Sequence, residues 1–184
     1  MSKIRINKMD AARRQIDAAI RMTFSAEDPV AIHSVISAAN RIVRDLCTKR
    51  GDIESYLRFT DWIADGYEKQ FWSAFNASTN FIKHAHDDPD AIFDLDDEAS
   101  DFLIVFTSKW YRDLGNTTTR EMNVFMTWWA AQHEELVNAE FIEQFERGGV
   151  GNAFFEVVRA MTSFDRRQKL RAGRLLLRPN ATAG

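Results

Sequence analysis

Apolar residues recur every three or four positions through most of this 184-residue chain. Within residues 8–24, one helical face carries the apolar residues Met9, Ala12, Ile16, Ala19, Ile20 and Phe24. This spacing is typical of an amphipathic α-helix. Only 3 Pro and 8 Gly interrupt the chain. The pattern therefore predicts an all-α fold rather than a β-sandwich or barrel.

Capping residues and breaks divide this pattern into separate helices. Asp28 is suited to an N-cap and Pro29 to the first helical turn, where its missing N–H costs nothing. Further helices are predicted over residues 29–50, 53–64, 67–83, 98–114, 120–137, 153–162 and 164–177. We expect a helical bundle of six to eight helices whose core is formed by residues 8–24, 29–50, 67–83 and 98–114.

The glycine cluster at residues 148–151 divides the chain into two predicted parts. Residues 1–147 are interpreted as the helical bundle domain. Residues 148–184 are interpreted as a C-terminal helical appendage, with a basic amphipathic helix and a disordered tail. The stripe of Met and aromatic residues in 120–137 is typical of a core or a dimer interface.

Composition narrows the class of protein. Hydrophobic residues make up 45% of the chain, with 14 Phe and 5 Trp, which favours a packed core and a homodimer. The single cysteine, Cys47, excludes an intramolecular disulfide and a cysteine-based zinc site. No apolar run reaches the ~18–20 residues of a membrane span. We expect a cytoplasmic protein that makes no membrane contact.

Residues 80–90 concentrate hydrogen-bonding groups where a helix is expected to end. Asn80 and His84 are four apart, so on a helix they share a face and the carboxamide can fix one imidazole tautomer. Lys83 could reach an anion, and a histidine that titrates near neutrality could carry a proton. The alternative is plain helix termination, because a cation and a histidine suit the last turn.

A ligand pocket at this bend is the leading interpretation. His33 lies in the first turns of the second helix, near its positive end, and could meet the bend across the bundle. The predicted ligand-binding set is His33, Asn80, Lys83, His84 and Asp87. No cofactor is expected. No metal site is expected either, because His84 and His86 do not face one another on a helix and the acidic run lacks a calcium-loop pattern.

Three motifs resemble a family of proteobacterial and phage proteins that has no established activity. They are Met9-Asp10-Ala11-Ala12-Arg13-Arg14-Gln15, Asp28-Pro29-Val30-x-Ile32-His33, and the run from Asn80-Phe81-x-Lys83-His84-Ala85 to Asp90. The resemblance covers residues 8–130. Two positions depart from the family pattern, since His86 replaces the usual acid and Ile82 the second Phe.

The segment Thr79-Asn80-x-x-x-His84 is similar, more distantly, to the motif of the HEPN superfamily of helical ribonucleases and nucleotide-binding domains. This resemblance implies an up-down helical core and a dimer. It also implies a metal-independent ribonuclease in which His84 is the general acid/base and Asn80 orients it. Thr79 stands where that family has an arginine, and Lys83 is not a bidentate substitute.

Two charged segments suggest a partner surface: an acidic run in the middle of the chain and a basic helix in the expected appendage. Residues 87–101 contain acidic residues and no basic one. The predicted partner-binding residues in the C-terminal helix are Arg166, Arg167, Lys169, Arg171 and Arg174. Nucleic acid is not favoured, because aromatics for base stacking are missing here and the chain is acidic overall. The alternative is that the leucines of this helix dock on the domain or on a second subunit.

These observations favour a non-catalytic helical binding or regulatory protein of bacterial or phage origin. Its ligand would be anionic or nucleotide-like and would lie near the Asn80/His84 bend. A divergent HEPN-like ribonuclease is the first alternative. The second is an interaction protein that captures a protein partner through the acidic loop or the basic tail.

Overall fold

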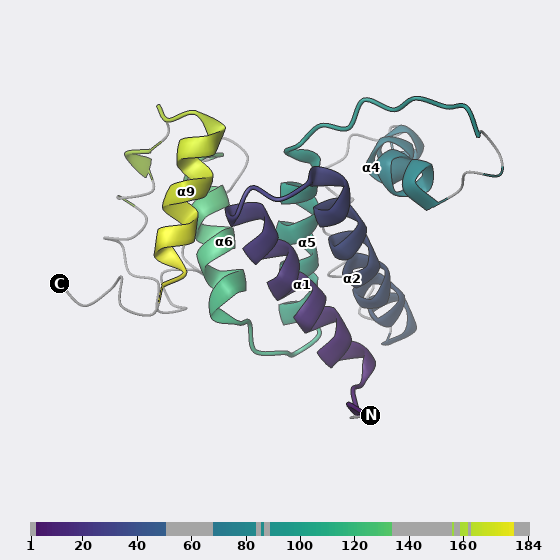
Figure 1. The fold of residues 1–184 in the computed structure, drawn as a ribbon. Helices are drawn as coiled ribbons and strands as arrows, with labels where there is room; N and C mark the ends of the chain where they lie inside the picture. The colour runs from purple at the N-terminus through teal and green to yellow at the C-terminus, as the bar shows by residue number, and fades with distance from the viewer. Residues whose placement is uncertain are drawn as a thin grey trace.

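The computed structural model describes residues 3–50, 68–83, 86, 89–133, 156, 159–161 and 163–178. These residues form six α-helices and no strand, which confirms the predicted all-α fold (Figure 1). The helices are α1 (Lys8–Phe24), α2 (Pro29–Arg50), α4 (Glu68–Lys83), α5 (Ala99–Asp113), α6 (Arg120–Ala130) and α9 (Arg166–Leu176). In the described ranges, no helix has both the length and the apolar character of a membrane span.

The first two helices begin where their capping residues place them. Asn7 Oδ1 accepts the backbone N–H of Asp10 at 2.8 Å and starts α1, whose bounds match the predicted 8–24. Asp28 Oδ1 accepts the N–H groups of Val30 and Ala31 at 2.9 and 3.1 Å. Asp28 is therefore the N-cap of α2, as predicted, because its carboxylate satisfies donors that the helix leaves open.

Helix α6 is shorter than predicted. It begins at the expected residue, where Thr119 Oγ1 accepts the N–H of Met122 at 3.2 Å. It ends at Ala130, whereas the apolar pattern had extended it to residue 137. Gln132 Nε2 donates to the carbonyl of Trp128 at 2.8 Å, and this side chain closes the last turn. Periodicity alone does not reveal such a cap.

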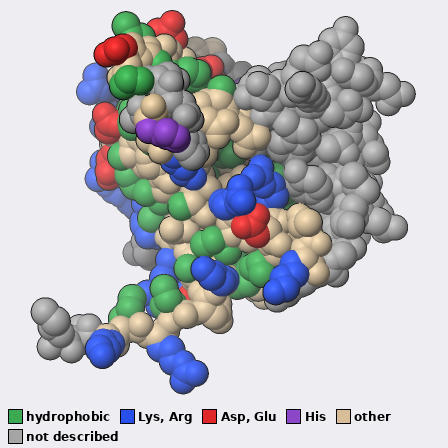
Figure 2. All heavy atoms as spheres, turned by 90° about the vertical axis from the view of Figure 1, so that its right-hand side faces the viewer, with side chains coloured by type: hydrophobic (Ala, Val, Ile, Leu, Met, Phe, Trp, Pro, Cys, Tyr) green, Lys and Arg blue, Asp and Glu red, His purple; other side chains and the backbone are tan. Residues whose placement is uncertain are grey.

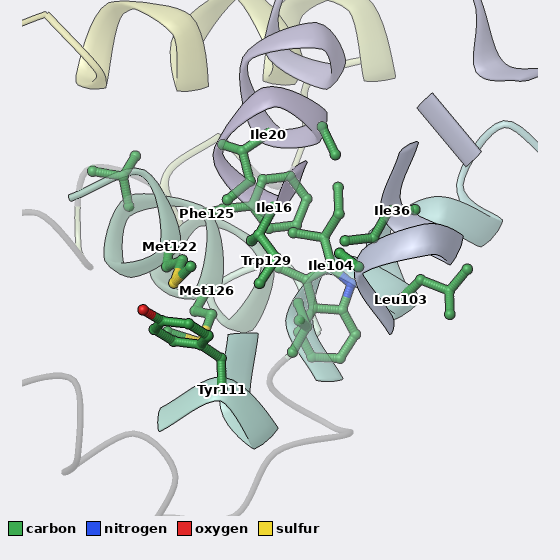
Figure 3. Close-up of a cluster of buried hydrophobic side chains, with 14 of the residues drawn as sticks. Ile16, Ile20, Ile36, Leu103, Ile104, Tyr111, Met122, Phe125, Met126 and Trp129 are labelled. Atoms are coloured by element: carbon green, nitrogen blue, oxygen red, sulfur yellow. The ribbon is translucent and has the colours of Figure 1, made fainter. Parts of the chain in front are cut away.

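The core lies between α1, α2, α5 and α6 (Figure 3). The Met and aromatic stripe of α6 is buried in it, as the sequence predicted: Met122, Phe125, Met126, Trp128 and Trp129. The expected core set omitted α6, which the structure places in the core. Among the side chains of α4 that are described, those of residues 76–83, only Ser78 is buried.

Helices α2 and α5 run in the same direction. His33 contacts Ser100 and Asn40 contacts Thr107, and both pairs are separated by 67 residues. After a short turn, α2 runs back antiparallel to α1. Helix α9 lies against α1 and α6 (Figure 1). Leu170 of α9 belongs to the core cluster. The boundary predicted at residue 148 and the helix predicted over 53–64 lie outside the described residues.

Candidate functional site

His33 is sealed inside the bundle rather than open to a ligand. Its side chain is 1% exposed. Nδ1 lies 3.2 Å from Ser100 Oγ of α5, and Nε2 lies 3.1 Å from Thr79 Oγ1 of α4. Both ring nitrogens therefore have hydroxyl partners, and a hydroxyl can donate to one nitrogen while it accepts from the other. His33 joins three helices.

A row of polar side chains continues from His33 along the same face of α2. Thr79 Oγ1 also lies 2.9 Å from Ser37 Oγ. Asn40 Nδ2 donates to Thr107 Oγ1 of α5 at 3.0 Å. The positions 33, 37 and 40 are spaced by four and three, so they face the neighbouring helices together. We call His33, Ser37, Asn40, Thr79, Ser100 and Thr107 the polar seam.

Burial favours the neutral form of the His33 imidazole in the polar seam. Burial of the imidazole lowers the pKa of His33, and the positive charge of Lys83 lowers it further, by a smaller amount. The ring is therefore neutral at pH 7 and acts as one donor and one acceptor. A neutral imidazole with both nitrogens bonded and almost no exposure positions helices. It is not placed to exchange a proton with a substrate.

The stability of the protein should depend on pH through His33. Because the folded-state pKa lies below the ordinary 6.5, the unfolded chain binds the proton first, and stability falls as the pH drops below about 6.5. We expect His33→Gln to flatten this dependence and to cost about 1 kcal/mol at pH 7 through its lost hydrogen bond. Urea unfolding at several pH values tests this. His86→Gln, which removes an exposed imidazole, is the control, and an unchanged pH profile in His33→Gln would contradict the assignment.

The predicted ligand-binding residues separate into an inner and an outer group. His33 is inside. Asn80 and Lys83 lie exposed in the last turn of α4, three residues apart and so on one helix face. His84 and Asp87 lie outside the described residues. Figure 2 shows the molecular side that carries α2 and α4, where a histidine and Lys or Arg side chains share the surface. In the described part of the chain, no group of His, Cys, Asp and Glu side chains could hold a metal ion.

The predicted partner-binding residues do not form one exposed surface. Arg166, the first of them, is folded back onto the start of α5. Its Nη1 donates to Asp101 Oδ2 at 2.8 Å, and its Nη2 donates to the carbonyl of Asp97 at 2.9 Å. Nη1 also lies 3.4 Å from Glu98 Oε1. Asp101 is 3% exposed, so Arg166 balances a buried carboxylate.

The rest of α9 has a docked face and a free face. Leu170 is buried, and the carbonyl of Lys169 accepts the indole N–H of Trp128 at 3.1 Å. Lys169 itself is half-buried. Arg167, Arg171 and Arg174 remain exposed. The packing matches the alternative in which the leucine face docks on the domain, and it leaves three arginines for any partner.

The sequence interpretation missed the hydroxyl residues of the seam. Ser100 and Thr107 were not singled out, since hydroxyls are common on helix surfaces, and Thr79 was noted only as the residue in place of an arginine. The one available signal was the spacing of His33, Ser37 and Asn40 within the apolar face of α2. Polar residues that recur inside an apolar stripe need partners from a neighbouring helix.

Comparisons of the chain with protein-family models, with curated proteins and with solved structures found no match. The fold and the seam define its class: an all-α protein whose second helix is joined to α4 and α5 by a buried histidine and hydroxyl groups.

Proposed function

We propose that the protein is a non-catalytic helical binding protein that receives an anionic ligand beside Asn80 and Lys83. Both side chains are exposed at the end of α4. In the described part of the chain, Lys83 makes no ion pair, and its charge acts on His33 at the start of α2. An unpaired cation with a carboxamide on the same helix face suits phosphate or carboxylate oxygens.

The sealed state of His33 is the observation that carries the non-catalytic proposal. The one described histidine of the predicted set has both nitrogens occupied by hydroxyl groups. The two arginines in the middle of α2 that could supply a ribonuclease with positive charge have other partners. Arg41 Nε donates to Asp45 at 3.1 Å, and Arg44 Nη1 donates to Asn76 at 3.5 Å. Neither hydrogen-bonds to Asn80, so neither of these two arginines is placed beside it to stabilise a phosphorane-like charge.

Calorimetric titration with inorganic pyrophosphate and with ATP, in EDTA, tests the anion site. We expect Lys83→Ala to weaken binding by about tenfold, the effect of one charge-assisted contact. Lys49→Ala removes another exposed lysine, near the far end of α2, and should leave the affinity unchanged. Equal affinity in wild type and Lys83→Ala, or no heat of binding with either anion, would contradict the proposal.

Incubation with single-stranded RNA in EDTA separates this proposal from the ribonuclease alternative. We expect the RNA to remain intact. Cleavage that survives EDTA and disappears in His84→Ala would replace the binding role by a HEPN-like ribonuclease. His33→Gln is the matched control, since a structural histidine should not affect cleavage.

A further inference from the structure

Residues 91–96 form a drawn-out, non-helical segment ahead of α5. The segment crosses one end of the molecule before α5 begins (Figure 1). Exposure alternates along it: residues 92, 94 and 96 are exposed, and residues 93 and 95 are half-buried. The backbone of residues 91–95 makes no backbone hydrogen bond within the described part of the chain. Such a segment has the form of a free strand edge.

Apolar and acidic groups line this segment. Ile92 is 94% exposed, and the ring of Phe93 stacks on that of Phe81 at a centroid distance of 5.3 Å. Phe81 is itself 37% exposed. Asp94 lies on the outward face with Ile92, Asp90 precedes them, and neither carboxylate has an ion-pair partner among the described residues. We call residues 90–96 the acidic strand.

The N-terminal segment has the complementary pattern. Residues 3–7 precede α1 without helical structure, and we call residues 3–6 the basic arm. Ile4 is 71% exposed and Ile6 is 46% exposed. In an extended chain they share one face, and Lys3 and Arg5 share the other. Within the described ranges, neither cation has an ion-pair partner and the arm makes no backbone hydrogen bond before Asn7.

The basic arm cannot reach the acidic strand of its own molecule. Helix α1 runs antiparallel to α2 and therefore to α5, so the arm lies at the end where α5 finishes, and Figure 1 shows the two segments at opposite ends. Helix α5 has 15 residues and spans about 22 Å. The four residues of the arm extend at most about 14 Å. The complementary surfaces must therefore meet between molecules.

We propose that the basic arm of one copy pairs as a β-strand with the acidic strand of a second copy. The matching holds on both faces. The face of Lys3 and Arg5 meets the outward carboxylates, and the face of Ile4 and Ile6 meets the half-buried side chains of residues 93 and 95. Main-chain hydrogen bonds supply affinity in this mode, and alternate side chains supply register.

Two copies in opposite orientation can make this contact twice. The arm and the strand lie at opposite ends, so a two-fold axis brings each arm to the other copy's strand. A single short two-stranded pair is marginal in water, whereas two pairs formed together gain from effective concentration. The exposed charges also make the association sensitive to salt.

Sedimentation velocity of the full chain tests the proposal by charge exchange. We expect wild type to associate between about 10 μM and about 1 mM. Lys3→Glu with Arg5→Glu gives the arm variant, and Asp90→Lys with Asp94→Lys gives the strand variant. Each variant alone pairs like charges, so its dissociation constant should rise at least tenfold. An equimolar mixture pairs opposite charges at both contacts and should associate as wild type does.

Matched controls separate specific pairing from net charge. Lys49→Glu with Arg178→Glu changes the net charge by the same amount as the arm variant, at exposed positions that belong to neither segment. This control should associate as wild type does, and Ile4→Pro should not associate. All altered residues are exposed, and unchanged thermal melts would show that the variants fold. A wild type that stays monomeric over this range, an arm variant that associates normally, or a mixture that fails to associate would each overturn the proposal.

Discussion

Arg166→Ala should lower the free energy of unfolding at pH 7 by about 3–5 kcal/mol, the usual cost of leaving a buried charge without its partner. Arg166 donates two hydrogen bonds to Asp101, at 2.8 and 3.4 Å, and Asp101 is 3% exposed. The same guanidinium bonds the carbonyl of Asp97. Removing it also frees the start of α9 from the start of α5.

The loss of unfolding free energy in Arg166→Ala should be smaller at acidic pH. Burial raises the pKa of Asp101 to about 6, against the opposing effect of Arg166. Because this lies above the ordinary 3.8, the folded state holds the extra proton, and stability falls as the pH rises from about 3.8 to about 6. Loss of Arg166 raises the pKa further, so the variant gains more than wild type from acidification.

Urea unfolding of wild type and variant at pH 5 and pH 7 measures both effects. Arg167→Ala, at the exposed neighbouring position, should change stability by no more than about 0.5 kcal/mol. Asp101→Asn combined with Arg166→Leu removes both charges and should recover much of the loss. A loss below about 1 kcal/mol in Arg166→Ala, or a loss that grows in acid, would contradict the assigned role.

The local features of the fold were predictable from the sequence, and the long-range ones were not. The bounds of α1, the cap at Asp28 and the buried stripe of α6 follow from spacing and capping within a few residues. Arg166 was assigned to a partner because its acceptor Asp101 lies 65 residues away in the chain. Nothing local distinguishes an arginine that balances a buried acid from one on a free face.

The candidate site shows the same division. The sequence analysis paired Asn80 with His84, which lies outside the described residues; in the structure Asn80 and Lys83 are both exposed in the last turn of α4. His33 was expected to line the same pocket, but α4 and α5 supply two hydroxyl partners that seal it. His33 and Ser100 are 67 residues apart in the chain, and the packing of α2 against α5 brings them into contact. Burial of a histidine therefore depends on tertiary contacts that a single helix pattern does not contain.

Gly173→Ala should destabilise the protein by about 1–3 kcal/mol, although the same change on an exposed helix surface stabilises by up to about 1 kcal/mol. Gly173 lies in α9 against Phe24 of α1. A Cβ atom at Gly173 would stand 2.7 Å from Phe24 Cζ and closer still to Cε1 and Cδ1. The ring cannot turn away, because Phe125 and Trp128 pack on it at 5.3 and 5.2 Å.

The added methyl must therefore displace α9, which would also strain the bond from Trp128 to the carbonyl of Lys169. Thermal and urea unfolding, with tryptophan fluorescence as the signal, measure the effect. Arg171→Ala, at an exposed position of the same helix, is the control and should be near neutral. Phe24→Leu makes room for the methyl at the cost of core packing, so its combination with Gly173→Ala should cost less than the sum of the two changes. Strict additivity, or a stabilised Gly173→Ala, would show that α9 does not rest on Phe24 as the structure places it.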